Sequence, residues 1–206
     1  MVSKKRRENE KEKMRKLILN ASVKIILEDG YDKLSMRKIA DKIEYSATTI
    51  YLYYKDKNEI VEDISIGIYE KIVKNIKNVL ENNKNLSIEK QIELSFKEFI
   101  YSITDNPEMG RAVIRSGTSA MLGPRNERED QEITGIDMLG NLLVKGQEEK
   151  VFSKIEEFMP LMIISSLIGF SMNAIENRLY EDDNWDNLVD KYSRLLLDGL
   201  LYRERD

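Results

Sequence analysis

The sequence predicts an all-α protein, and three observations support this fold class. Apolar residues recur at the three- and four-residue intervals of one helix face along most of the chain. Only ten Gly and three Pro occur among 206 residues, so helix-breaking positions are few. No segment shows the pattern of a strand, and no internal repeat is present. We therefore expect a three-helix N-terminal head joined to a larger helical body.

The first helix is expected from Met14 to Asp29, where the apolar residues fall on one face. Gly30 follows and suits a helix C-terminus in the left-handed conformation. Residues 1–13 are nearly all charged or polar. They are expected to form either a frayed basic arm able to reach along a binding partner or a solubilising extension of the helix.

Two short helices are expected next, separated by a tight turn. Ser35 stands at the N-cap position of the first, directly before Met36. The turn is expected at residues 44–46 and the second short helix at 47–54, with Ile50 pointing inward. Asp56 can then cap a long fourth helix from Lys57 to about Glu81.

The remainder of the chain predicts further helices joined by short breaks. They are expected at 87–104, from Asn106-Pro107, at 127–147, from Ser153 and after Asn184. Residues 153–156 have the capping-box pattern, whereas Pro160 either kinks the helix that follows or marks a later start. Residues 117–125 are expected to form a loop.

The composition excludes several kinds of catalytic and metal-binding site. The chain has no Cys and no His, so disulfides, thiolate nucleophiles and the usual serine triads or histidine metal sites are excluded. We expect no metal, no cofactor and no enzymatic activity, although carboxylate chemistry stays open as an alternative. The apolar runs are too short to span a bilayer, and no secretory signal is evident. A cytoplasmic protein without a membrane partner is expected.

The charges are distributed unevenly along the chain. Residues 1–57 carry 15 Lys/Arg against 9 Asp/Glu, a net charge of about +6, whereas the whole chain has a net charge of −4. Residues 58–206 are therefore acidic. Such an asymmetry indicates a basic binding domain, residues 1–57, joined to an acidic domain, residues 58–206. The basic domain would be attracted to a polyanion.

The second short helix and its end are rich in side chains that hydrogen-bond to DNA. Hydroxyl groups lie at Ser46, Thr48, Thr49, Tyr51, Tyr53 and Tyr54, and Lys55 and Lys57 follow. Hydroxyls and lysines bond to phosphates and base edges, and a helix needed only for packing would not carry all of them. DNA is therefore the expected partner, the alternative being a helical hairpin that only packs.

Residues 14–61 resemble the N-terminal DNA-binding domain of the TetR family of transcriptional regulators. The resemblance rests on ILNASVKIILEDGYDKLSMRKIADKI and SATTIYLYYKDKNEIV, which follow the family's order of Gly-Tyr, Ser/Thr, Ile-Ala and Ser-x-x-Thr-Leu-Tyr-x-Tyr-Phe-x-x-Lys. It implies DNA contacts at Ser35, Arg37, Lys38, Ser46, Ala47, Thr48, Thr49, Tyr51, Tyr53 and Lys57. Among these, Ser35 would cap its helix beside a phosphate, Thr48 and Thr49 would face the major groove, and Lys57 would contact a phosphate.

Two residues depart from the family pattern, both in the turn. Glu44 stands where the family usually has Gly, and Tyr45 where Val is common. A non-glycine residue in the left-handed region costs on the order of 1 kcal/mol, so the geometry of the turn is expected to differ slightly from that of the family. The Tyr45 ring is expected to be partly exposed.

The last two predicted helices are strongly apolar and contain small residues that allow close approach of another helix. A single short recognition helix covers few base pairs, so we expect a two-fold homodimer through these helices, as in the family. The expected interface residues are Ser165, Gly169, Met172, Tyr192, Leu196 and Gly199. The alternative is an internal core face.

The middle helices carry many Met and aromatic residues, which line adaptable apolar pockets as well as ordinary cores. The resemblance implies a regulatory domain that senses a small molecule. The candidate ligand contacts are Phe96, Phe99, Met109, Arg111, Arg115, Met121, Met162 and Asn173. Core packing is the alternative for each apolar member.

Together these patterns predict a ligand-responsive transcriptional regulator that binds double-stranded DNA as a homodimer. We expect a repressor that a small apolar or amphipathic effector releases from a palindromic operator. The alternatives are an architectural DNA-binding protein or an activator without an effector and, more remotely, a carboxylate-based enzyme.

Overall fold

The computed structural model describes residues 2–116 and 134–201, with the side chains of 2–5 and 114–116 excepted. Within these residues every regular element is a helix, apart from an isolated antiparallel bridge between Phe152 and Leu201. The all-α prediction is confirmed. The predicted loop at 117–125 and the start of the predicted helix 127–147 lie outside the described residues, as does Met121.

The chain divides into two compact units. The first holds the chain up to Gly67 together with the segment from Glu108, which contains most of α6 (Pro107–Ser116). The second holds Ile68–Pro107 and the C-terminal part of the chain. The helix α4 (Lys57–Asn82) contributes its first turns to the first unit and the remainder to the second.

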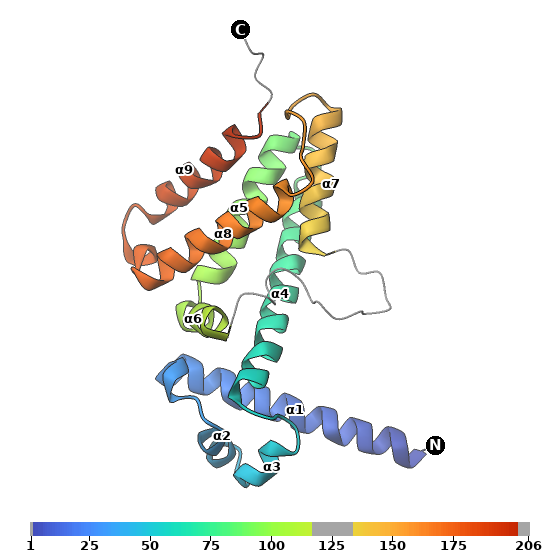
Figure 1. The fold of residues 1–206 in the computed structure, drawn as a ribbon, viewed down its shortest axis with the longest axis vertical. Helices are drawn as coiled ribbons and strands as arrows, with labels where there is room; N and C mark the ends of the chain where they lie inside the picture. The colour runs from blue at the N-terminus through green and yellow to red at the C-terminus, as the bar shows by residue number, and fades with distance from the viewer. Residues whose placement is uncertain (1, 117–133, 202–206) are drawn as a thin grey trace. The chain divides into compact units, whose positions relative to one another are not determined.

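The first unit is built on α1 (Val2–Asp29), α2 (Met36–Lys42) and α3 (Ala47–Tyr51). Figure 1 shows α2 and α3 side by side next to α1. The predicted inward residues form its core, since Ile18, Ile25, Ile39, Ile50 and Ile60 have no exposed surface. The helix α1 includes residues 2–13. Of the two expectations for this segment, the helix extension is therefore correct.

Gly30 ends α1 with a positive φ of 83° and a ψ of 161°. The expected positive φ is confirmed, but ψ is extended and does not have the left-handed helical value. Gly30 N–H donates to the carbonyl of Ile26 at 3.0 Å, which closes the last turn. Residues other than glycine rarely adopt this backbone conformation.

Asp56 caps α4 as predicted, accepting from the N–H groups of Asn58 and Glu59.

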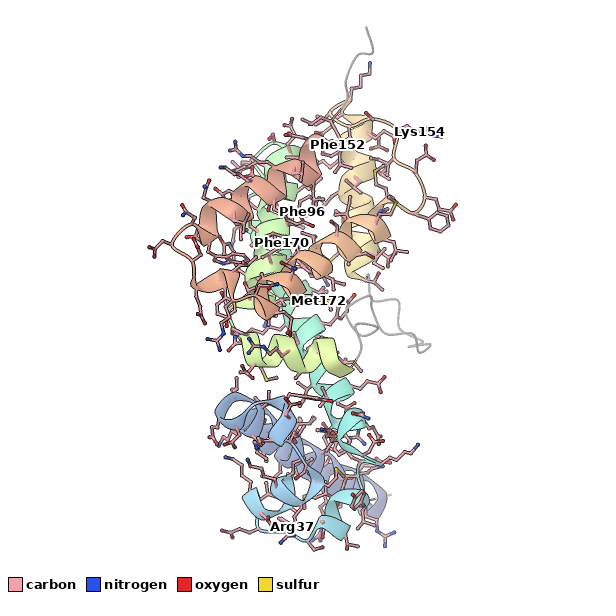
Figure 2. The ribbon with its side chains drawn as sticks, turned by 60° about the vertical axis from the view of Figure 1, so that its left-hand side comes forward. Arg37, Phe96, Phe152, Lys154, Phe170 and Met172 are labelled. Atoms are coloured by element: carbon pink, nitrogen blue, oxygen red, sulfur yellow. The ribbon has the colours of Figure 1, made fainter. Side chains whose placement is uncertain are left out.

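In the second unit α5 (Ile88–Thr104) contacts α7 (Gly135–Glu148), α8 (Met159–Glu176) and α9 (Trp185–Asp198). Figure 1 shows α8 crossing α5, and Figure 2 labels Phe96 on α5 and Phe170 on α8. Because α5 packs against three helices, many of its residues are buried, Ile92, Phe96 and Ile100 among them.

The predicted helix start at Ser153 is wrong. Ser153 donates its N–H to Leu200 at 2.9 Å and its hydroxyl to Leu201 at 3.1 Å, so the hydroxyl caps no helix. The helix α8 begins at Met159, with Pro160 in its first turn. Proline suits that position because the first N–H groups of a helix have no partner within it. The later start, one of the two expectations for Pro160, is therefore correct.

Among the described residues, α8 is the one helix whose length and apolar composition would allow it to cross a membrane. The core helices of soluble proteins can have the same length and composition. In this structure α8 packs against α5 and α7, with Ile163, Leu167 and Ile175 buried, so its apolar residues have a place in the core of the unit.

Candidate nucleic-acid interface and ligand pocket

Both short helices of the first unit begin at a serine cap. The hydroxyl of Ser35 accepts from the N–H of Lys38 at 3.2 Å, which confirms the predicted cap of α2. Ser46 caps α3 in the same way, accepting from the N–H of Thr49 at 3.1 Å. The Ser46 and Thr49 hydroxyls are also 2.9 Å apart. The capping role of Ser46 was not anticipated, although a serine directly before a short helix signals it.

The turn between α2 and α3 contains a non-glycine residue in the left-handed region. Glu44 adopts a φ of 60° in the left-handed region. Its N–H donates to Asp41, and the N–H of Tyr45 donates to the carbonyl of Ala40 at 3.0 Å. The turn is thus held by the backbone bonds that a glycine would also make. The Tyr45 side chain is 46% exposed, as expected.

The outer face of α3 is exposed and rich in hydroxyls. Thr48 is exposed, Thr49 is half-buried, and Tyr51 is 56% exposed. Leu52, at the end of α3, is 76% exposed and is the most exposed of the large apolar side chains in the described residues. Leu52 was not predicted as a DNA contact, because an apolar residue in a short helix is ordinarily expected to be buried in the core. Its position makes it a candidate for apolar contact with a thymine methyl group or a sugar.

The basic side chains near α2 and α3 differ in their surroundings. Lys38 lies 2.8 Å from the carboxylate of Asp29, and this hydrogen bond lowers the pKa of Asp29. Lys57 lies over the Tyr31 ring, with its ammonium 4.7 Å from the ring centroid. Arg37 is exposed at the outer edge of the domain (Figure 2). The positive charge of Arg37 is therefore open to an anionic partner.

Three side chains, Arg15, Tyr54 and Asp63, form a cluster that we call the clasp. The Arg15 guanidinium bonds to the Asp63 carboxylate at 2.7 Å and lies 4.3 Å above the centroid of the Tyr54 ring. It also donates to the carbonyl of Tyr53 at 3.2 Å, and the Tyr54 hydroxyl donates to Asp63 at 2.9 Å. Burial and the bond to Asp63 raise the pKa of Tyr54. The clasp thus ties the residues after α3 to both α1 and α4.

A pocket lies wholly within the second unit, between residues of α4, α5, α7 and α8. Its volume is about 50 Å³. Phe96 and Phe99 line it, as do Ile72 and Val73 of α4. Its wall is almost entirely apolar.

The other predicted ligand contacts whose side chains the structure describes lie elsewhere. Met109 and Arg111 are on α6 in the first unit, where Arg111 pairs with Glu108. Met162 and Asn173 are exposed on α8. The side chain of Arg115 and all of Met121 fall outside the described residues. Of the predicted contacts whose side chains are described, only Phe96 and Phe99 line the pocket.

The predicted dimer residues occupy the outer sides of α8 and α9. Ser165, Gly169 and Gly199 are exposed, whereas Met172, Tyr192 and Leu196 are half-buried. Tyr192 also packs within its own chain, since its ring stacks on Phe170 at 3.9 Å and its hydroxyl donates to the carbonyl of Ser166 at 2.8 Å. Large apolar side chains accompany them on the surface, namely Leu161, Met162, Leu188 and Leu195.

No group of three or more metal-ligating side chains is found within residues 2–116 and 134–201.

Residues 18–64 match the family model described as bacterial regulatory proteins, tetR family. A 90-residue segment is 27% identical to an uncharacterized HTH-type transcriptional regulator of Haemophilus influenzae. This match spans 44% of the present chain and 47% of that relative, about half of its length.

Solved structures share the fold over nearly the full chain. The fatty acid degradation regulator FadR from Bacillus halodurans has a TM-score of 0.67 at 20% identity, with 92% of this chain and 97% of that chain covered. RolR in complex with resorcinol has a TM-score of 0.68 at 15% identity, covering 94% and 90%. At these identities the likeness concerns the fold alone.

The serine-capped helices α2 and α3 form a helix-turn-helix. Because residues 18–64 match the family model, this part of the chain is similar to the DNA-binding domain of the TetR family of transcriptional regulators. That family consists of DNA-binding regulators and not of enzymes.

Proposed function

We propose that this chain is a homodimeric transcriptional repressor, released from a palindromic operator by a small apolar or amphipathic effector. The observation that carries the proposal is the face of α3. It presents Thr48 and Tyr51 to solvent, and Arg37 is exposed on α2, the other helix of the serine-capped pair.

The proposed DNA contacts divide into two kinds. Thr48, Thr49, Tyr51 and Leu52 would meet base edges in the major groove, because hydroxyls and apolar groups read bases there. A second set would bond to phosphates and fix the position of the helix, namely Ser35, Arg37, Lys38, Ser46, Tyr53 and Lys57. Lys38 would have to share its charge with Asp29, 2.8 Å away. Ala47, at the first position of α3, would allow close approach of the backbone.

A homodimer through α8 and α9 is supported by their outer surfaces. Leu195 and Met162 are 68% and 67% exposed, next to the exposed small residues Gly169 and Gly199. Burying such side chains against a second copy removes apolar surface from water at about 25 cal/mol per Å². A two-fold dimer would also double the number of bases read by one short helix.

Control by an effector would act through α4. The same continuous helix supplies Ile72 and Val73 to the pocket and Ile60 to the core of the first unit. A ligand that binds one arrangement of the dimer more tightly lowers operator affinity by the ratio of its two affinities.

The test is selection of genomic DNA fragments by the purified chain, followed by footprinting of the selected fragments. We expect a protected palindrome whose half-site centres lie about one helical turn, roughly 34–36 Å, or a multiple of it apart. Protection without any sequence preference would contradict the proposal and favour an architectural DNA-binding protein.

A further inference from the structure

Among the described residues, those that line the pocket in the second unit carry no charged side chain. Fourteen described residues line it, and all are apolar except Tyr69 and Ser95, with Gly135 contributing backbone. A charged group that enters such a site loses its water and gains no partner of opposite sign. The wall thus selects strongly against charge within the pocket.

The two hydroxyls of the wall are not equivalent. The Ser95 hydroxyl donates to the carbonyl of Gln91 at 2.8 Å, so its proton is already used. The Tyr69 hydroxyl accepts from the N–H of Gly135 at 2.8 Å. Within the described part of the chain this is its single hydrogen bond, so the Tyr69 proton can be donated to a molecule in the pocket.

The surroundings of Tyr69 keep this donor neutral and disfavour an anion. Burial raises the pKa of the Tyr69 phenol, the N–H of Gly135 lowers it, and the negative charge of Asp137 raises it again, with a net increase. The phenol therefore stays protonated at neutral pH. The Asp137 carboxylate that raises this pKa would also repel a ligand carboxylate placed at the same end of the pocket.

We propose that the pocket binds an electrically neutral, largely apolar molecule with one hydrogen-bond acceptor, which takes the proton of the Tyr69 hydroxyl. This inference rests on the proposed function in treating the bound molecule as the effector. The pocket volume of about 50 Å³ limits the ligand to a small molecule. A single ring, which occupies a cavity of about 150 Å³, requires the walls to move apart. Tyr69 lies on α4 and Gly135 on α7, so such a ligand adds to a tie that already joins the two helices.

Four ring compounds of nearly equal size test the inference: benzyl alcohol, benzoate, benzylammonium and toluene. Their affinities for the full chain are measured by calorimetry at neutral pH. We expect benzyl alcohol to bind at least about tenfold more tightly than either ion, because a buried unpaired charge is costly. Benzoate binding as tightly as benzyl alcohol, or no binding by any of the four, would overturn the proposal.

Two variants assign the contact to this pocket. Tyr69→Phe should weaken benzyl alcohol about fivefold and leave toluene unchanged, because only the hydrogen bond is lost. Tyr101→Phe is the matched control, since the Tyr101 hydroxyl donates to Asp186 and lies outside the pocket. Equal effects of the two variants on benzyl alcohol would refute the role of Tyr69.

A third variant reports occupancy without removing a polar group. A methyl group at Gly135 would lie 3.5 Å from Tyr69 and Val73, an ordinary contact, so Gly135→Ala should fold normally and narrow the pocket. It should weaken toluene and benzyl alcohol alike, and unchanged binding of both would place them elsewhere. Operator affinity is measured separately with each ligand. Selective binding without any change in DNA affinity supports the pocket assignment and refutes only the effector role.

Discussion

At the scale of single residues, the helices and the turn of the first unit depend on local contacts. Ser35 and Asp56 cap their helices, and Glu44 adopts the left-handed backbone that its place in the turn requires. Each of these depends on a few neighbouring residues, so the sequence contains the necessary information. The pairing of Lys38 with Asp29 depends on how α1 and α2 pack, which no local pattern specifies.

The Tyr51 hydroxyl gives the first prediction. Because the side chain is 56% exposed, Tyr51→Phe should leave the free energy of unfolding unchanged. It should weaken specific DNA binding by about 1 kcal/mol, roughly fivefold, through loss of one hydrogen bond. Fluorescence anisotropy with a selected operator at fixed salt measures the effect. Unchanged affinity would remove this hydroxyl from the proposed contacts.

The second prediction concerns the charge of Lys57. If its ammonium contacts a phosphate, Lys57→Ala should reduce the slope of log affinity against log salt by about one unit. Lys154→Ala is the control, because Lys154 is exposed in the second unit, next to Glu156 and far along the chain from α3 (Figure 2). The control should leave the slope unchanged. A slope that is the same for Lys57→Ala and the unmodified chain would exclude the phosphate contact.

At the scale of elements, the positions of the helices were predicted better than their ends. The helix α4 spans Lys57–Asn82, against a predicted end near Glu81, because a long apolar face defines it. The third helix ends at Tyr51, three residues earlier than predicted. After Tyr51 the chain forms a tighter turn, in which the N–H of Tyr53 donates to the carbonyl of Ile50, three residues earlier. Ser153 was misassigned because its hydroxyl bonds to the distant Leu201, a tertiary contact that the capping pattern cannot reveal.

The clasp tests how the end of α3 is held. Arg15→Met keeps the apolar stem but removes the bonds to Asp63 and to the carbonyl of Tyr53. We expect it to lower the free energy of unfolding by about 1–2 kcal/mol, since hydrogen bonds of charged groups are stronger than neutral ones. Arg6→Met is the control on the same helix, because the Arg6–Glu10 pair is exposed and should contribute little. Urea unfolding measures both, and equal losses would argue against the clasp.

The acidic side chain of Glu93 links pH to the stability of the second unit. Burial alone would raise its pKa, but hydrogen bonds from Lys97 and Lys90 lower it below the ordinary value of 4.5. Lys97 also bonds to Asp190 and thereby joins α5 to α9. Because the folded pKa is the lower one, the stabilisation is present above pH 4.5 and is lost as the pH falls below it.

Glu93→Gln should therefore flatten the decline in stability as the pH falls from about 5 to 3. Thermal unfolding as a function of pH measures the decline, with the melting temperature of each protein referred to its own value at pH 7. Glu149→Gln, at an exposed residue at the end of α7, is the control. A Glu93→Gln variant that declines as steeply as the unmodified chain would show that the ion pairs contribute nothing.

At the scale of the whole molecule, the fold class and the head could be predicted, whereas the pocket could not. Periodicity reveals which residues are buried, and the head has a specific motif. The pocket depends on gaps between packed helices, and a sequence pattern does not show where such gaps lie. Of the eight predicted ligand contacts, Phe96 and Phe99 line the pocket. The grouping of most of α6 with the first unit is likewise a result of packing that the sequence pattern does not show.

The central claim is that the exposed face of α3 reads a specific DNA sequence. The most direct test compares the affinity of the full chain for a selected operator with that for a scrambled duplex of equal length, at one salt concentration. The account predicts a preference of at least about 10³-fold, as for specific DNA-binding proteins, reduced toward unity by the double substitution Thr48→Ala and Tyr51→Ala. Equal affinity for the two duplexes, or a preference that survives this double substitution, would contradict it.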